Sequence, residues 1–357
     1  MIKLSEASFD EEEKKAVLRV LDSGWYIHGK EIEAFEKEFA EFTGTKYAVA
    51  CSNGTTAIHL VLQSLGIGKG DEVLVPSHTA FPTIEPILNL GATPVFVEID
   101  EKTFTMDPKD AEKKISQKTK AIMPVHLYGH PAQLDAFSEL CKKHHLLLIE
   151  DCCQAHGALY KRKHVGSIGD AGCFSFYPSK NMTVFGDGGM VITNNKTAYE
   201  SMKLLRNHGM EDRYNHIVLG NNFRVSEIAC ALGRVQLKRL PSFIQKRRKL
   251  AHLYSSLLEN TQLSLPQEMP NVKHAYHLYV IKHPKRNALK EYLLKSEIVS
   301  EVHYPIPGHL QKAVSSLPRT KLPVTEKVVH EILSLPIYPK LTENQVVQIC
   351  DTIKKFR

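Results

Sequence analysis

Between residues 47 and 193 the sequence repeats one pattern, in which a short apolar run is followed by a turn and a helical stretch. The apolar runs show no regular polar alternation, which is typical of strands that are buried on both faces of a parallel sheet. Strands that alternate with helices predict an α/β fold, with a mainly parallel sheet between two layers of helices. The pattern predicts seven strands, over residues 47–51, 72–76, 94–99, 121–125, 146–150, 171–176 and 190–193.

The N-terminal segment is predicted to be helical. Ser8 and Glu11 have the spacing of a capping box that opens a first helix. Phe35 and Phe39 lie on one face of a second helix, which Gly44 is expected to end.

Past about residue 240 the alternation stops, and the chain reads as a smaller α+β unit. The elements expected there are helices over 226–239 and 242–259, a strand over 277–282, a helix over 286–295, a strand over 301–304 and a helix over 343–355. We therefore predict a large α/β domain over residues 1–240 and a small C-terminal α+β domain over residues 241–357, with a boundary near Pro241.

Composition excludes several classes of protein. The 357 residues are 43% hydrophobic and carry a formal net charge of +7, an excess that favours anionic ligands. The basic run 246–249 lies at helical spacing and no nucleic-acid motif accompanies it, so no nucleic-acid partner is predicted. No apolar run approaches the ~20 residues of a membrane span, and the N-terminus lacks an apolar signal core. No membrane association is therefore predicted.

The cysteines point to a reducing compartment. There are seven, none in a C-x-x-C motif, and Cys152 and Cys153 are adjacent, which is poor geometry for a disulfide. A reduced, cytoplasmic chain is predicted. Although His156 follows Asp151 closely, no metal-ligand spacing is present, so no metal site is predicted.

Three features are expected at the carboxyl edge of the sheet, where open parallel sheets bind ligands. The segment SNGTT (52–56) feeds a helix whose free N–H groups favour a phosphate, although alone it also fits an ordinary helix cap. Asp151 follows a strand, where acids also cap turns, and Lys180 lies in FYPSKNMTVFGDGG, where a surface charge is the alternative. Together, a phosphate anchor, a carboxylate and a lysine are what pyridoxal phosphate requires.

The chain resembles the DegT/DnrJ/EryC1/StrS family of sugar aminotransferases, which are fold-type I pyridoxal-phosphate enzymes. The resemblance covers nearly the whole chain, through NGTTAIHL, VPSHT followed by GATPVFVEID, VHLYGHP, IEDCCQAHGA, GDAGCFSFYPSKNMTVFGDGGMVIT, GNNFRVSEIACALGRVQL and LSLPIYP. It implies the fold-type I transferase fold and a pyridoxal 5′-phosphate cofactor.

The resemblance also implies roles for individual residues. Lys180 matches the Schiff-base lysine and Asp151 the acid at the pyridine nitrogen, which makes these two the catalytic residues. Further cofactor contacts implied in this way are Gly54, Thr55, Thr56 and Ser175 at the phosphate, and Gln154 at the ring face or its phenolic oxygen. Asn222 matches an asparagine that reaches the phosphate of the neighbouring subunit's cofactor, which implies a homodimer with shared active sites.

One position departs from the family pattern. After VPSHT, members usually carry an aromatic residue that stacks on the cofactor ring, whereas this chain has Ala80. Phe81, the next residue, and His78 are the two candidates for that stacking role.

The resemblance implies transfer of an amino group from an amino acid, most often L-glutamate, to a nucleotide-linked keto-deoxysugar in aminosugar biosynthesis. The nucleotide is thymidine or uridine diphosphate, and pyridoxamine 5′-phosphate carries the amine between the halves of a ping-pong reaction. Relatives with histidine in place of the lysine are dehydratases, and Lys180 argues against that activity. A cyclitol aminotransferase and a non-catalytic binding or regulatory protein on the same fold remain alternatives.

Substrate contacts are expected from aromatic and basic residues in the loop 24–30, in the GNNFR segment and at positions 303 and 304. The candidates are Trp25, Tyr26, His28, Arg224, His303 and Tyr304. For each of them a packing or loop-shaping role is the alternative.

Overall fold

The centre of the computed structural model, which describes residues 1–356, is a seven-stranded sheet in the order β1-β9-β8-β5-β4-β2-β3. Its strands are β1 (Tyr47–Cys51), β2 (Glu72–Pro76), β3 (Thr93–Val97), β4 (Thr119–Ile122), β5 (Leu147–Asp151), β8 (Ala171–Ser175) and β9 (Gly189–Thr193). Only β9 runs antiparallel to its neighbours. The predicted mainly parallel sheet is therefore confirmed.

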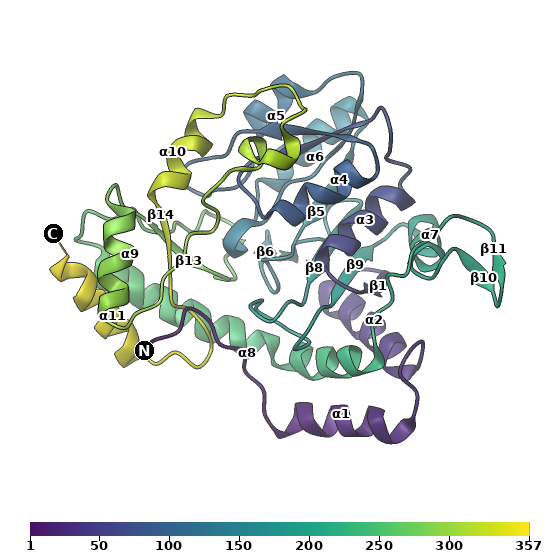
Figure 1. Cartoon of the computed structure of the whole chain (residues 1–357), viewed down its shortest axis with the longest axis horizontal. Helices are drawn as coiled ribbons and strands as arrows, with labels where there is room; N and C mark the ends of the chain where they lie inside the picture. Colours follow the sequence, from purple (N-terminus) through teal and green to yellow (C-terminus); the bar gives the residue numbers. More distant parts are fainter. Residues whose placement is uncertain (357) are drawn as a thin grey trace.

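Helices cover both faces of the sheet (Figure 1). Consecutive residues of a strand point to opposite faces: Val73 and Val75 of β2 pack in a core with α3, α4 and α7, whereas Leu74 packs with α5 and α6. The helices of these layers are α2 (Lys30–Thr43), α3 (Gly54–Ser64), α4 (Glu85–Asn89), α5 (Pro108–Lys114), α6 (Leu134–His144) and α7 (Lys196–Arg206). No helix within residues 1–356 is long and apolar enough to cross a bilayer.

The C-terminal part has a core of its own. It contains the antiparallel pair β13 (Tyr279–Lys282) and β14 (Ile332–Leu335), with helices α9 (Arg286–Lys295), α10 (Pro323–Glu331) and α11 (Glu343–Lys355). The predicted helices 286–295 and 343–355 are confirmed. The predicted strand over 301–304 is wrong, because Glu301 forms only an isolated bridge with Ser334. A separate small sheet consists of three two-residue strands, β6 (Leu159–Tyr160), β7 (Lys163–His164) and β12 (Val272–Lys273).

A single helix, α8 (Glu227–Leu258), joins the two parts (Figure 1). The predicted break between 226–239 and 242–259 is wrong, since Pro241 lies inside this helix. Proline destabilises the interior of a helix. The apolar face of α8 nevertheless continues past Pro241, because Leu240 packs in the core beside α2 and Leu250 packs in the core of the C-terminal part. The proposed domain boundary at residue 240 therefore falls within a continuous element.

The first helix, α1 (Glu11–Ser23), begins at a different cap from the predicted one. Asp10 rather than Ser8 is the N-cap, and its backbone N–H donates to Glu13 at 2.8 Å. Glu13 is buried and Arg239 of α8 donates to it at 2.7 Å. This long-range ion pair selects the box at 10–13 over the one at 8–11. Helix α2 ends at Gly44 in a left-handed conformation (φ 73°), as predicted.

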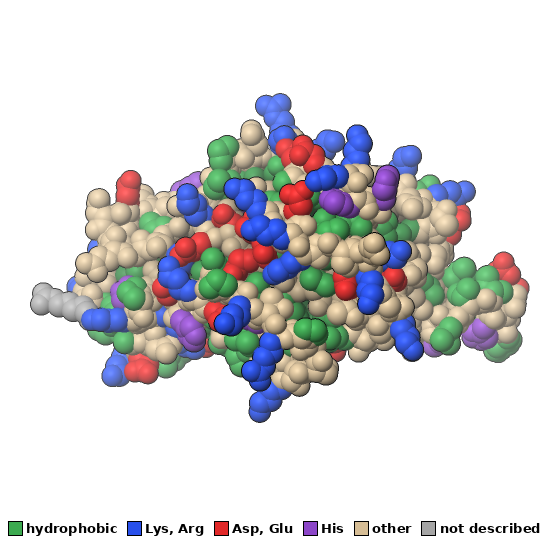
Figure 2. All heavy atoms as spheres, turned by 90° about the horizontal axis from the view of Figure 1, so that it is seen from above, with side chains coloured by type: hydrophobic (Ala, Val, Ile, Leu, Met, Phe, Trp, Pro, Cys, Tyr) green, Lys and Arg blue, Asp and Glu red, His purple; other side chains and the backbone are tan. Residues whose placement is uncertain are grey.

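A hairpin of β10 (Met210–Asp212) and β11 (Asn215–His216) extends from the body of the molecule (Figure 1). Tyr214 and Leu219 in this segment are 78% and 89% exposed. Figure 2 shows hydrophobic side chains gathered on the projecting end of the molecule. Exposed apolar side chains gathered in this way are typical of protein–protein contacts.

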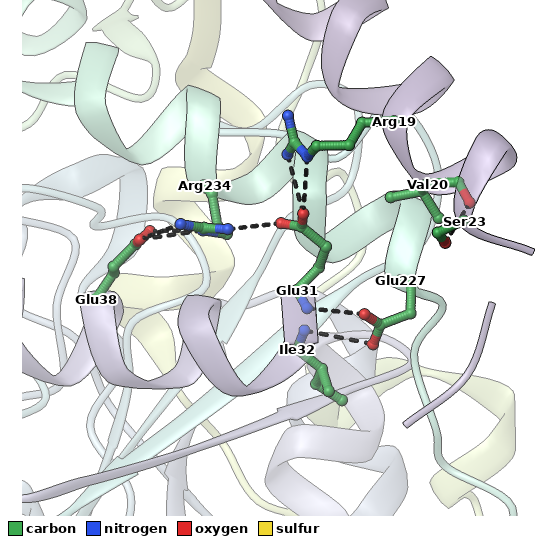
Figure 3. Close-up of polar contacts among 8 residues, drawn as sticks. All are labelled: Arg19, Val20, Ser23, Glu31, Ile32, Glu38, Glu227 and Arg234. Carbon is green, nitrogen blue, oxygen red and sulfur yellow. Dashed lines mark hydrogen bonds and ion pairs between the residues drawn. The ribbon is translucent and has the colours of Figure 1, made fainter. Parts of the chain in front are cut away.

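A buried carboxylate holds the start of α2 against α8 (Figure 3). The N-cap of α2, Gly29, offers no side chain, and Glu227 accepts instead from the N–H groups of Gly29 (2.9 Å), Glu31 (2.8 Å) and Ile32 (3.3 Å). A Cβ on Gly29 would lie 2.7 Å from a Glu227 oxygen, so a larger residue there would displace that carboxylate. Arg234 adds an ion pair to Glu31 at 2.7 Å. The loop that carries Trp25 and His28 is thus fixed on α8.

Replacement of Glu227 with alanine would leave these backbone donors without an acceptor. We expect Glu227→Ala to lower the free energy of unfolding by about 2–4 kcal/mol in urea denaturation. Glu33→Ala, an exposed acid in the same first turn, is the control and should change it by less than ~0.5 kcal/mol. Equal losses in the two variants would show that Glu227 does not cap α2.

Candidate active site

A cavity of about 340 Å³ lies at the carboxyl ends of the parallel strands. The ends of β5 and β8, the start of α3, and the segments after β2 and β8 supply its wall. The predicted residues that line it are Gly54, Thr55, Asp151, Gln154, Ser175 and Lys180. The fold thus brings together, at one cavity, groups that lie more than a hundred residues apart in the sequence.

One end of the cavity has the chemistry of an anion site. Helix α3 begins at Gly54, and its first intrahelical bond runs from Ala57 N–H to Asn53 O, so the N–H groups of Gly54 and Thr55 have no helical acceptor. A Cβ on Gly54 would lie 2.7 Å from the Cβ of Ser175, so only glycine permits this close approach. The helix-terminal amides and the Ser175 hydroxyl therefore lie close together at one end of the cavity.

Thr56 is placed differently from Thr55. Its hydroxyl accepts from Asn53 N–H at 3.0 Å and donates to Asn53 O at 2.8 Å, within the capping box of α3. Thr56 does not line the cavity. Its contribution to the predicted phosphate turn is to fix the helix start.

Asp151, the last residue of β5, is 2% exposed. Its Oδ1 accepts from Cys153 N–H at 3.0 Å and its Oδ2 from the Thr83 hydroxyl at 2.8 Å. Thr83 in turn contacts the Thr79 hydroxyl at 2.8 Å. These bonds hold the carboxyl group of Asp151 in one orientation at the wall of the cavity.

Lys180 lies in the turn that follows β8, and its side chain lines the cavity beside Asp151. Burial lowers the pKa of Lys180, and the neighbouring Cys153 and Asp151 offset only part of that effect. A lowered pKa increases the fraction of neutral amine, which is the nucleophilic form of lysine.

Gln154 connects the cavity wall to the C-terminal part of the chain. Its Oε1 accepts from Tyr128 N–H at 2.8 Å and its Nε2 donates to the Tyr304 hydroxyl at 2.9 Å. Tyr128 also donates to the carbonyl of His303, whose imidazole contacts Ser334 at 2.9 Å. Burial raises the pKa of Tyr304 and lowers the pKa of His303 to about 4, so both are neutral near pH 7. Of the predicted contacts, Tyr304 therefore binds Gln154 directly and His303 binds Tyr128.

Neither candidate for ring stacking lines the cavity. His78 is fully buried, its Nε2 contacts the Tyr128 hydroxyl at 2.7 Å, and burial lowers its pKa to about 3. Phe81 packs against the apolar core around α3 and α4. Thr79 and Ala80 line the cavity in their place. The placement of these two rings, which are engaged in other contacts, does not support a stacking role.

The remaining predicted residues lie outside this cavity. Trp25 is 61% exposed, which excludes a core role, and it lines a separate surface cavity with His28, while Tyr26 is 48% exposed. Arg224 donates to Asn207 Oδ1 at 3.0 Å, and Asn222 is exposed. None of these side chains reaches the Lys180 cavity of its own chain.

Several residues of the cavity wall were not predicted. Among them are Thr79, Thr83, Cys153, Tyr177 and Asp187. The spacing of Thr79 and Thr83 could have identified them, since hydroxyls four residues apart after a strand end lie on one side of a helical turn. Tyr177 and Asp187 flank Lys180 within the stretch already singled out.

The family model described as the DegT/DnrJ/EryC1/StrS aminotransferase family matches residues 7–354, and the chain belongs to this family. A "Pleiotropic regulatory protein" of Geobacillus stearothermophilus is 41% identical over 365 residues, covering 100% of this chain and 98% of the relative. A "dTDP-3-amino-3,6-dideoxy-alpha-D-galactopyranose transaminase" of Aneurinibacillus thermoaerophilus is 40% identical over 348 residues, with coverage of 98% and 96%.

Among solved structures, S. venezuelae DesV in complex with a ketimine intermediate superposes with a TM-score of 0.94. It is 41% identical, and the match covers 97% of this chain and 94% of DesV. The fold class expected from the sequence is confirmed, and the chain has the fold and the family of an aminotransferase.

The lowered pKa of Lys180 has a consequence for stability. Since a buried ammonium is costly, we expect Lys180→Met to stabilise the cofactor-free protein by about 1 kcal/mol near pH 7. Between the folded-state and unfolded-state pKa values the native wild type binds fewer protons than the unfolded chain, so its stability rises with pH. The gain should therefore shrink at about pH 9.5 in urea denaturation. An equal gain at both pH values would contradict this assignment.

Proposed function

We propose that the chain is a pyridoxal-phosphate-dependent aminotransferase that transfers an amino group from L-glutamate to a nucleotide-linked keto-deoxysugar in aminosugar biosynthesis. One observation carries the proposal: Lys180, the carboxylate of Asp151 and the helix-terminal amides of α3 all face one cavity. The absence of a side chain on Gly54, which lets those amides approach Ser175, fits a bound phosphate. The family of the chain agrees with the reaction class.

Each residue has a distinct task in this proposal. The N–H groups of Gly54 and Thr55 and the Ser175 hydroxyl bind the phosphate, and Asp151 keeps a proton at the pyridine nitrogen. Pyridoxal phosphate, when bound, supplies an aldehyde that reacts with amines and a ring that accepts an electron pair. Lys180 Nζ would be the amine that holds that aldehyde, and in its free form it would take the proton from the donor's α-carbon as a general base.

The acceptor is proposed from the relatives. The Aneurinibacillus relative is named for a thymidine-diphosphate-linked aminosugar, and similarity at 40% identity over 98% of the chain supports an acceptor of the same class. Uridine diphosphate is an equally suitable nucleotide, because the net charge of +7 favours a diphosphate of either kind. A cyclitol ketone is the alternative acceptor, and assay of a panel of nucleotide-linked keto-sugars and keto-cyclitols separates the two.

A regulatory function is the alternative of another class, and the Geobacillus relative is named as a regulatory protein. The cavity argues against it as the sole function, since a half-buried lysine with a lowered pKa beside a fixed carboxylate is typical of a catalytic site.

Absorbance spectroscopy tests the enzymatic proposal directly. Protein loaded with pyridoxal phosphate should show a visible absorption band that Lys180→Ala lacks, because the band requires the bond to Nζ. Addition of L-glutamate alone should bleach the wild-type band and release about one equivalent of 2-oxoglutarate per site, as a ping-pong reaction requires. If the wild type shows no band, the proposal fails.

We also propose that the chain works as a homodimer in the cytoplasm, with Asn222 reaching the cofactor phosphate of the second copy. Asn222 is exposed and lies just after the projecting hairpin, whose Tyr214 and Leu219 offer apolar surface to a partner. All seven cysteines are free, which suits a reducing compartment.

Complementation tests the shared site. Lys180→Ala and Asn222→Asp should each be inactive alone, since the first lacks the amine and the second repels the phosphate. In a mixed dimer one site combines the intact Lys180 of one chain with the intact Asn222 of the other. An equal mixture, dissociated and reassociated, should therefore recover about a quarter of wild-type activity. If Asn222 serves its own chain, no mixed site is intact and no activity returns.

A further inference from the structure

Directly before Asp151, a fully buried glutamate lies on the opposite face of β5 from the cavity. Glu150 is 0% exposed and does not line the cavity. Its Oε1 accepts from the N–H groups of Ile168 (2.9 Å) and Gly169 (2.7 Å). Its Oε2 accepts from Gly166 N–H (2.7 Å) and from His126 Nε2 (3.0 Å). The carboxylate of Glu150, the penultimate residue of β5, thus binds both the backbone of the loop 166–169 and the imidazole of His126.

His126 completes the arrangement. It is 0% exposed, and its Nδ1 accepts from Ala132 N–H at 3.0 Å, so Nε2 is the ring nitrogen that donates to Glu150. The same residue binds the backbone of Asp151, because His126 N–H donates to Asp151 O at 3.0 Å. The side chain of His126 therefore holds Glu150 while its main chain holds Asp151.

A metal ion is not what this group binds. His126, Glu150 and Cys152 do place their ligand atoms within 4.8 Å of one another. Both nitrogens of His126 are engaged, however, and each oxygen of Glu150 already accepts from two donors. Burial also raises the pKa of Cys152, which keeps its thiol protonated and a poor ligand. The cluster is complete without a cation.

The loop bound by Glu150 fits closely against the strands on either side of it. A Cβ on Gly169 would lie 2.4 Å from the carbonyl of Leu148 in β5, and one on Gly172 would lie 2.3 Å from Gly166. Asp170 N–H also donates to Leu148 O at 2.8 Å. Movement of the loop would therefore displace β5, and with it the backbone of Asp151.

We propose that Glu150 and His126 form a buried positioning pair, which fixes the carboxylate of Asp151 at the angle needed to hold the proton of the cofactor's ring nitrogen. The inference rests on the proposed pyridoxal-phosphate function. Neither residue touches the cavity, and both act through the β5 backbone. Asp151 is held from the cavity side by Thr83 and from the far side by this pair.

The test compares two buried glutamates. A glutamine at position 150 has one acceptor oxygen and turns an NH₂ group toward two of its four donors. We expect Glu150→Gln to weaken pyridoxal-phosphate binding about tenfold or more, as replacement of orienting residues does at other sites. It should also shift to higher pH the midpoint of the pH-dependent change in the absorption band, because a misaligned Asp151 leaves less positive charge on the ring.

Glu98→Gln is the matched control. Glu98 is also buried and accepts from the N–H groups of Ile99 (3.0 Å), Val324 (2.9 Å) and Thr325 (2.8 Å), but it holds α10 rather than β5. It should lose comparable stability while binding of pyridoxal phosphate and the spectroscopic midpoint stay within about twofold and about 0.2 pH units of the wild type. Equal changes in the two variants would overturn the proposal, since general destabilisation would then explain both.

A double-mutant cycle tests whether Glu150 acts through Asp151. In an Asp151→Asn background, Glu150→Gln should weaken cofactor binding by less than about twofold further. Additive losses would overturn the proposal. If Glu150→Gln does not fold, His126→Gln replaces it, and a change in the same direction is expected. Failure of the wild type itself to bind pyridoxal phosphate would refute the proposed function rather than the positioning pair.

Discussion

The parallel pairing of β5 with β4 and β8 is the constraint on which the rest of this structure depends. Parallel neighbours end at the same edge of a sheet, so the register that sets Asp151 opposite Cys173 also brings Ser175, two residues further, to the cavity. Lys180 then follows within a turn. The antiparallel β9 beside β8 returns the chain so that Gly189 passes the start of α3, where a Cβ would lie 2.2 Å from Asn53 O. Strand order therefore decides which segments meet at the cavity.

The sequence was sufficient for features that local pattern determines. The seven strands, the end of α2 at Gly44 and the helices α9 and α11 follow from apolar periodicity and capping residues, and each is confirmed. Where prediction failed, a distant partner decided the outcome. Arg239 selects Asp10 over Ser8 as the cap of α1, and packing on two cores carries α8 through Pro241. Sequence spacing holds no information about such partners.

The same distinction applies to the site. Residue type and strand position were enough to single out Lys180, Asp151 and the α3 turn, and the structure places them at one cavity. The hydrogen-bond partners of individual side chains were not predictable from the sequence. Thr56 forms hydrogen bonds within the capping box of α3, Gln154 binds two tyrosines, and His78 binds Tyr128. Each of these bonds depends on backbone geometry that arises only after distant segments have packed.

The continuity of α8 bears on how this protein would unfold. At 32 residues the helix is about 48 Å long, and its buried residues belong to both hydrophobic cores. Each of these two cores contains apolar side chains from α8. Unfolding of the helix would therefore expose apolar surface in both cores. The chain is therefore expected to behave as one cooperative folding unit, in which the two lobes cannot be separated by cutting a linker. A fragment that ends at residue 240 would retain the catalytic residues of the proposal but lose the half of α8 that packs in the C-terminal core.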